Sequence, residues 1–179
     1  VLPGTDCVLP QWKGVTMKTV DLVVPCYNEE EVIETFYRET DKVVSQINGY
    51  RFYYILIDDG SKDRTFIKFK ELAKNHPEIK YISFSRNFGK ESAIYAGLRH
   101  SASDYVIVMD ADLQHPPSMI PAMLEGIEEG YDCVAAMRAD RKGESKIRSF
   151  FSSQFYKLSN WMSDVKMAKG AVDFRIMTR

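Results

Sequence analysis

The feature that most constrains this chain is a regular alternation of short apolar runs with longer amphipathic segments. The apolar runs are rich in β-branched and aromatic residues and cover 20–25, 52–57, 79–84, 105–109 and 133–137. The segments between them carry apolar residues at helical spacing over 30–47, 63–75, 91–100 and 119–129. Strands that alternate with helices are typical of βαβ units. We therefore predict an α/β fold with a mostly parallel central sheet and helices on both faces.

Charge and cysteine content exclude several classes of protein. The 179 residues include 24 Lys plus Arg and 25 Asp plus Glu, which gives a net charge of −1 at pH 7. A balance this close to neutral argues against a uniformly basic nucleic-acid-binding protein, so we expect no nucleic-acid partner. The three cysteines are widely scattered. They match neither a disulfide framework nor a zinc site, which favours a reducing compartment.

The periodic pattern also suggests domain limits. Residues 1–16 show no periodicity, and we interpret them as an upstream extension, with one domain over 17–179. The apolar runs that we identify are far shorter than the ~20 residues that a membrane-spanning helix needs. We therefore expect this chain itself to be soluble.

Acidic residues follow two of the predicted strands. Asp58 and Asp59 come directly after the second strand, and Asp110 and Asp112 after the fourth. The carboxyl ends of parallel strands meet at one edge of the sheet, where ligands of open α/β sheets bind. Two carboxylates at positions i and i+2 can converge on one hard cation, Mg²⁺ or Mn²⁺. The alternative is that Asp-x-Asp simply forms a turn.

Two further segments lie at the same predicted edge. Pro25 ends the first strand, Tyr27 offers a ring for stacking on a base, and Glu29 can accept hydrogen bonds from ribose hydroxyls. The alternative here is a plain strand-to-helix turn with Asn28 as the helix N-cap. Lys90 opens the third helix, where its amine and the helix N-terminus favour an anion, although it could equally be a solvated first-turn residue.

Motifs that span most of the chain carry a resemblance to a known family. They are Val24-Pro25-Cys26-Tyr27-Asn28-Glu29-Glu30, Ile57-Asp58-Asp59-Gly60-Ser61-Lys62-Asp63, Ser85-Arg86-Asn87-Phe88-Gly89-Lys90, Met109-Asp110-Ala111-Asp112-Leu113-Gln114-His115-Pro116-Pro117 and Gly170-Ala171-Val172-Asp173-Phe174-Arg175. With these motifs the chain resembles the family 2 glycosyltransferases, which have the GT-A nucleotide-sugar-binding fold. It is most similar to their polyprenyl-phosphate branch, the group of dolichol-phosphate mannose synthase and bactoprenol glucosyltransferase.

The resemblance implies roles for the acidic edge. The residues implied to hold the nucleoside are Pro25, Tyr27, Glu29, Asp58 and Asp59. Asp110 is implied to lie near the ribose and the metal, and Asp112 to ligate the Mg²⁺ or Mn²⁺ ion that bridges the two phosphates of the donor. Gln114 is a candidate for a further oxygen ligand. Such an ion neutralises the leaving nucleoside diphosphate.

The acceptor side involves basic and aromatic residues. The resemblance implies that the stretch with Arg138 and Arg141 receives a lipid phosphate, for which the planar guanidinium suits. The aromatic segment 150–161 fits either a membrane interface or the packed core. Asp173 is a candidate general base for a sugar-hydroxyl acceptor. A phosphate acceptor hardly needs a base, in which case Asp173 would orient the acceptor or pair with Arg175.

These observations together predict an inverting, metal-dependent transferase for cell-envelope glycan synthesis. It would move a sugar from a nucleotide donor, UDP-linked in our interpretation, to a polyprenyl (undecaprenyl) phosphate at the cytoplasmic face of the membrane. The alternatives are a saccharide acceptor, or a catalytically silent nucleotide-sugar-binding module. Members of this branch commonly continue into transmembrane helices, so we expect this chain to be the catalytic portion of a longer, membrane-anchored protein, or a form that docks peripherally on the membrane. An oligomer of identical chains is left open.

Overall fold

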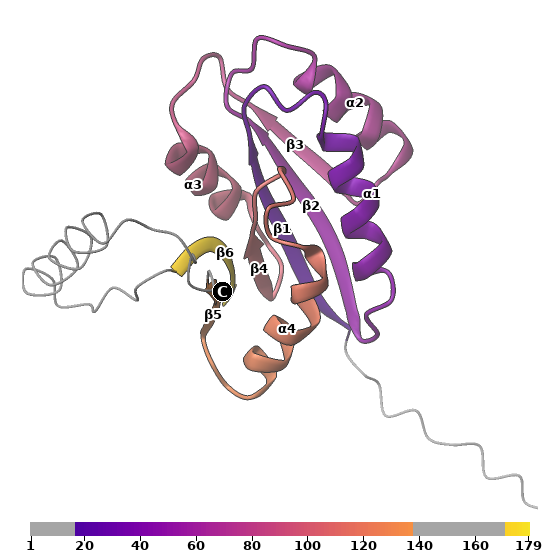
Figure 1. Ribbon diagram of the computed structural model, residues 1–179, viewed down its shortest axis with the longest axis vertical. Helices are drawn as coiled ribbons and strands as arrows, with labels where there is room; N and C mark the ends of the chain where they lie inside the picture. The colour runs from indigo at the N-terminus through magenta and orange to yellow at the C-terminus, as the bar shows by residue number, and fades with distance from the viewer. Residues whose placement is uncertain (1–16, 138–170) are drawn as a thin grey trace, which may run out of the picture.

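The computed structural model describes residues 17–137 and 171–179, which build a six-stranded sheet with helices packed against it (Figure 1). The strands are β1 (Lys18–Cys26), β2 (Tyr50–Asp58), β3 (Ile79–Ser83), β4 (Tyr105–Val108), β5 (Cys133–Met137) and β6 (Ala171–Thr178). Their order across the sheet is β3-β2-β1-β4-β6-β5. The pairs among β1 to β4 are parallel, and β6 runs antiparallel to both of its neighbours, β4 and β5. The predicted α/β fold with a mostly parallel sheet is confirmed.

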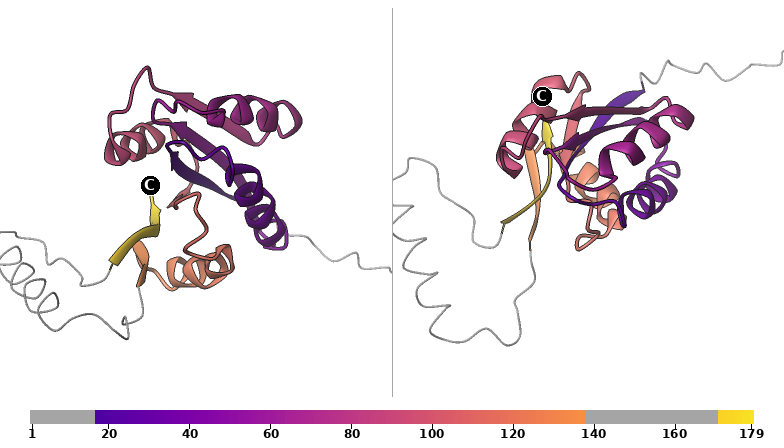
Figure 2. Two further views of the ribbon diagram at one scale, coloured as in Figure 1. Left: turned by 45° about the horizontal axis from the view of Figure 1, so that its top comes forward. Right: turned by 90° about the horizontal axis from the view of Figure 1, so that it is seen from above.

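Helices cover both faces of this sheet. The residues of α1 (Ile33–Val44), α2 (Thr65–Asn75) and α4 (Ile120–Glu128) pack into one large apolar core with the facing side chains of β1, β2 and β4. A 3₁₀ turn, η1 (Pro117–Met119), leads into α4. Among the described helices, α3 (Lys90–His100) alone packs into the core of the opposite face, and Figure 2 shows this helix apart from α1 and α4.

The helix α3 lies very close to the central strands. A Cβ atom on Gly97 would lie 2.4 Å from a methyl group of Val23 and 2.9 Å from Ile57, so only glycine permits this approach. At the far end of the helix, the buried carboxylate of Asp21 accepts hydrogen bonds from the Ser101 hydroxyl at 2.6 Å and the Ser103 amide at 3.1 Å. Both contacts fix α3 on the sheet, and its N-terminal residue, Lys90, lies at the carboxyl edge.

The first helix is shorter than predicted at both ends. The pattern predicts a helix over 30–47, whereas α1 begins at Ile33 and ends at Val44. It begins late because the backbone of Glu29 and Glu30 is hydrogen-bonded to another loop: the Glu29 amide donates to Thr65 Oγ1 and the Glu30 amide to Asp63 Oδ2. The alternative in which Asn28 caps this helix is therefore wrong.

Some predictions lie outside the described residues. They concern the extension over 1–16, the candidates Arg138 and Arg141, and the aromatic segment 150–161. Within 17–137 and 171–179, no helix combines the length and the apolar character that crossing a membrane requires.

Candidate active site

A cavity of about 390 Å³ lies at the carboxyl edge of the parallel strands. Its wall is formed by the end of β1, by the segments that follow β1, β2 and β4, and by the loop after β3 with the start of α3. The lining residues are Pro25, Cys26, Tyr27, Glu29, Asp59, Asn87, Gly89, Lys90, Asp110, Ala111 and Asp112. The structure thus brings together residues that were predicted separately from four motifs.

The loop after β1 is tied to the loop after β2 by reciprocal hydrogen bonds. The Asn28 amide donates to Ser61 Oγ, and the Lys62 amide donates back to Asn28 Oδ1, both at 2.9 Å. Asn28 has a φ of 56°, a left-handed conformation that asparagine tolerates better than most residues. These contacts fix the backbone directly after Tyr27, whose ring is 40% exposed and free to stack on a planar ligand.

The paired carboxylates after β2 differ in their surroundings. Asp58 is buried and does not line the cavity; its oxygens accept from the Ser61 amide at 2.9 Å and the Ser83 hydroxyl at 2.7 Å. Asp59 is only 3% exposed and does line it. Its two oxygens accept from the backbone amides of Phe88, at 2.7 Å, and Gly89, at 2.9 Å.

Gly60 allows the loop after β3 to approach this turn. Its φ is +69°, and a Cβ atom there would lie 2.3 Å from the carbonyl carbon of Arg86. Any larger residue would therefore push the loop away from Asp59. Because that loop continues through Gly89 into α3, the Asp59 and Gly60 contacts together determine where Lys90 lies.

Lys90 is the centre of a network of ion pairs. Its Nζ lies 2.8 Å from Asp110 Oδ1 and 2.9 Å from Asp110 Oδ2, and it donates to Asp173 Oδ2 at 2.7 Å. The other oxygen of Asp173 accepts from Arg175 at 3.0 Å. Asp173 reaches this position because β6 pairs with β4, with Arg175 opposite Val108.

These contacts determine the charge states in the network. The hydrogen bond from Lys90, helped by the charges of Lys90 and Arg175, lowers the pKa of Asp173. Burial on its own would lower the pKa of Lys90, but the hydrogen bonds to Asp110 and Asp173 raise it. Asp173 is thus held as a carboxylate and Lys90 as an ammonium. Of the roles left open for Asp173, the pairing with Arg175 is present.

Asp110 and Asp112 present oxygen atoms that suit a hard divalent cation. Both line the cavity, and Asp112 is exposed, with one oxygen accepting from the Gln114 amide at 3.0 Å. Gln114 itself is not among the lining residues. Across the described ranges, no three His, Cys, Asp or Glu side chains group closely enough to hold a metal ion. The pair fits an ion that takes its remaining ligands from water and substrate phosphates, as Mg²⁺ commonly does.

A third carboxylate adds to the negative charge of the cavity. Burial raises the pKa of Glu29, and the charges of Asp112 and Asp110 raise it further. Among the described residues, the only cationic side chain that lines the cavity is Lys90. The cavity therefore favours cations, or an anion that arrives together with a cation.

Four lining residues were not predicted from the sequence: Cys26, Asn87, Gly89 and Ala111. All four lie inside the motifs that carry the family resemblance. Asn87 and Gly89 could have been found from the parallel arrangement of β3 and β2, which brings the loop after β3 to the same edge of the sheet.

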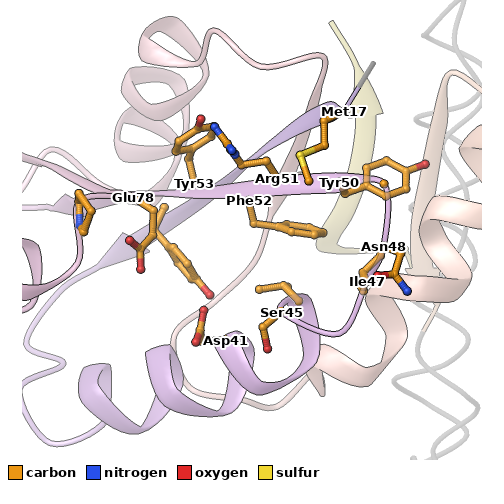
Figure 3. A pocket seen from close by; sticks show the side chains of 14 residues that line it. Met17, Asp41, Ser45, Ile47, Asn48, Tyr50, Arg51, Phe52, Tyr53 and Glu78 are labelled. Atoms are coloured by element: carbon orange, nitrogen blue, oxygen red, sulfur yellow. The ribbon is translucent and has the colours of Figure 1, made fainter. Parts of the chain in front are cut away.

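A second, larger cavity of about 530 Å³ lies at the opposite edge of the sheet, between the end of α1 and the start of β2 (Figure 3). Asp41, Ser45, Tyr50, Phe52 and Glu78 are among its lining residues. None of the predicted site residues contributes to it. Size alone therefore does not identify the functional site.

Comparison with known proteins assigns the family. The chain is 44% identical over 160 residues to the glycosyltransferase CsbB of Bacillus subtilis, covering 89% of this chain and 48% of that protein. It is 41% identical over 160 residues to the prophage bactoprenol glucosyl transferase homolog of Escherichia coli, covering 89% and 52%. The chain thus spans about half the length of these relatives.

The fold agrees with a solved structure of a similar enzyme. Glucosyl-3-phosphoglycerate synthase from Mycobacterium tuberculosis, in complex with Mn²⁺, UDP-glucose and phosphoglyceric acid, superposes with a TM-score of 0.62 at 21% identity. The match covers 90% of this chain and 56% of that one. The family model for glycosyl transferase family 2 matches residues 21–171. The resemblance predicted from the motifs is confirmed, and the chain belongs to glycosyl transferase family 2.

Proposed function

We propose that this chain is the donor-binding catalytic domain of an inverting glycosyltransferase that moves a sugar from a nucleoside-diphosphate donor, a UDP-sugar, to a polyprenyl phosphate. The observation that carries the proposal is the cavity at the carboxyl edge. It places an exposed ring (Tyr27), two carboxylates suited to a divalent ion (Asp110 and Asp112) and one ammonium (Lys90) around about 390 Å³. A nucleotide, a metal ion and a diphosphate need these three kinds of group.

Each side chain has a task in this reaction. A divalent ion bound by Asp110 and Asp112 would neutralise the diphosphate as the bond to the sugar breaks. Tyr27 stacks on the base, and Glu29 accepts from the ribose hydroxyls. Lys90 supplies the positive charge for the leaving diphosphate. Asp59 orients the start of α3 through the amides of Phe88 and Gly89.

The state of Asp173 favours a phosphate acceptor over a saccharide. A general base for a sugar hydroxyl works best with a pKa near the operating pH. The pairs with Lys90 and Arg175 lower the pKa of Asp173, which makes it a poor base. A phosphate acceptor, with a second pKa of about 6, is already an anion at neutral pH. Asp173 then orients Arg175 next to the incoming phosphate.

The names of similar proteins support the same substrates. The E. coli relative is named a bactoprenol glucosyl transferase homolog, and the M. tuberculosis enzyme was solved with UDP-glucose and Mn²⁺. We therefore propose a UDP-sugar with Mg²⁺ or Mn²⁺, an undecaprenyl phosphate acceptor and action at the cytoplasmic face of the membrane. Arg138 and Arg141 remain our candidates for binding the lipid phosphate.

Donor binding tests the proposal on this chain directly. UDP-sugars and GDP-sugars are titrated calorimetrically with and without Mn²⁺, for the wild type and Asp112→Asn. Asp132→Asn, an exposed carboxylate outside the cavity, serves as the matched control. We expect Mn²⁺-dependent binding of a UDP-sugar that Asp112→Asn weakens at least about tenfold and the control leaves unchanged. If no donor binds the wild type, the proposal is wrong.

Transfer separates the enzyme from its alternatives. The full-length protein is incubated with the bound donor and either undecaprenyl phosphate or free saccharides, and labelled product is followed. Lipid-linked product supports the proposal, whereas product on saccharides alone would replace the acceptor. Binding without any transfer would indicate a silent nucleotide-sugar-binding module.

A further inference from the structure

The ammonium of Lys90 pairs with Asp110, one of the two candidate metal ligands. It contacts both oxygens of Asp110, at 2.8 and 2.9 Å, so this carboxylate is already neutralised by a cation from its own chain. Asp112, two residues on, forms no ion pair within the described part of the chain. The two candidate metal ligands are therefore in different electrostatic states.

The position of Lys90 is built into the fold. Lys90 is the first residue of α3, directly after the turn that the buried Asp59 holds through the amides of Phe88 and Gly89. A second carboxylate, Asp173 on β6, accepts from the same ammonium at 2.7 Å. Three elements thus contribute to placing this one charge, which a solvated surface lysine would not require.

We propose that Lys90 is an internal counter-ion that competes with the divalent ion for Asp110 and is released to the diphosphate when donor and metal bind together. The competition between Lys90 and the metal ion is inferred from the ion pair between Lys90 and Asp110. The part that concerns the diphosphate rests on the proposed function. In the absence of nucleotide, the lysine keeps metal affinity low. In its presence, the phosphates attract the ammonium, and Asp110 becomes available to the ion.

This arrangement couples the two ligands thermodynamically. Because coupling is reciprocal, UDP must tighten Mn²⁺ binding by the same factor by which Mn²⁺ tightens UDP binding. Direct contact between phosphate and metal contributes part of this factor. Lys90 contributes the remainder, because its ammonium leaves Asp110 and pairs with the phosphate in the same step.

The test measures Mn²⁺ binding to this chain by electron paramagnetic resonance and calorimetry, with and without UDP. The variants are Lys90→Met, Lys90→Gln and Lys90→Arg, with Lys74→Met as a control that removes the same charge from an exposed position at the end of α2. Circular dichroism and thermal melts verify that each variant folds. Lys90 is 40% exposed, so we do not expect its replacement to prevent folding.

For Mn²⁺ alone, Lys90→Met and Lys90→Gln should bind at least about fivefold more tightly than the wild type. That is the factor for one unit charge about 4 Å away at the dielectric constant of water. Lys90→Arg and Lys74→Met should remain near the wild type. With Mn²⁺ present, Lys90→Met should bind UDP about tenfold more weakly than the wild type. The factor by which UDP and Mn²⁺ tighten each other's binding should therefore be smaller in this variant.

Unchanged or weaker Mn²⁺ binding by Lys90→Met would overturn the proposal, because the lysine would then support Asp110 rather than compete for it. The same conclusion follows if neither protein binds Mn²⁺ at millimolar concentrations. If Lys90→Met gains Mn²⁺ affinity but the wild type binds no nucleotide, the counter-ion is supported and the proposed donor class is wrong. The two proposals therefore fail separately.

Discussion

Replacement of Asp59 by asparagine tests how the site is positioned. Both carboxylate oxygens accept backbone amides, from Phe88 at 2.7 Å and Gly89 at 2.9 Å, and the side chain is 3% exposed. An asparagine keeps one acceptor of nearly the same shape and turns the other into an NH₂ donor. That donor faces an amide donor, so one of the two backbone groups loses its partner.

The expected cost follows from these contacts. A hydrogen bond to a charged group contributes about 1.5–3 kcal/mol, and a buried group left without a partner costs about 1–3 kcal/mol. Because these two figures partly describe the same event, we expect Asp59→Asn to lower the free energy of unfolding by about 2–4 kcal/mol. Burial of Asp59 means that solvent screening does not reduce this figure much.

Urea denaturation of the wild type and Asp59→Asn measures the loss. The control is Asp104→Asn, whose carboxylate also accepts two hydrogen bonds, from the Thr19 amide and hydroxyl at 2.7 and 2.8 Å, but is exposed. We expect a clearly smaller loss for that change, because the exposed carboxylate and its partners can hydrogen-bond to water instead. Hydrogen exchange at the Phe88 and Gly89 amides should accelerate in Asp59→Asn alone.

One result would refute this reasoning. If Asp59→Asn lost UDP binding while its stability and the protection of both amides stayed at wild-type levels, Asp59 would act on the nucleotide directly. The sequence-based role for Asp59, a contact to the nucleoside, would then stand in place of the anchoring role that its hydrogen bonds indicate.

Two further changes test neighbouring features. Gly60→Ala should destabilise the protein by about 2–4 kcal/mol in urea, because a Cβ would meet the Arg86 backbone at 2.3 Å. Gly49→Ala, with a φ of +85° but open space around it, should cost only about 1 kcal/mol; equal costs would contradict the close approach. Glu29→Gln should raise the melting temperature at pH 7 but not at pH 4. Folding raises the pKa of Glu29 above 4.5, so its ionisation weakens the fold only as pH rises past that value; a pH-independent difference would contradict this sign.

The sequence predicts the frame of the site well, for a physical reason. Strands β1, β2 and β4 are buried on both faces, so they appear as continuous apolar runs, and the polar residues after each run must lie at one edge. Asp59, Asp110 and their neighbours in the cavity could be placed together on that argument. This placement follows from the order of strands and helices in the sequence and requires no measured distance.

Other features depend on long-range contacts that the sequence pattern does not report. The sequence of the segment with Asp173 predicts only a short β-strand. Nothing in it predicts that β6 lies between β4 and β5 and runs antiparallel to both. The late start of α1 results from hydrogen bonds between Glu30 and the loop that contains Asp63, 33 residues away. The pairing of Lys90 with Asp110 similarly requires three separate elements to be in place.

The position of β6 has a consequence for the order of folding. Within the described ranges β5 pairs only with β6, so it gains this sheet neighbour only after β6 has been synthesised. The segments from β1 to β4 contain contiguous βαβ units that can assemble earlier, as N-terminal parts of a chain often do during translation. The cavity wall with Tyr27, Asp59 and Asp110 can therefore form before Asp173 arrives. A ribosome-bound chain that ends before β6 would be expected to expose one edge of β4 and to depend on chaperones until β6 pairs with that edge.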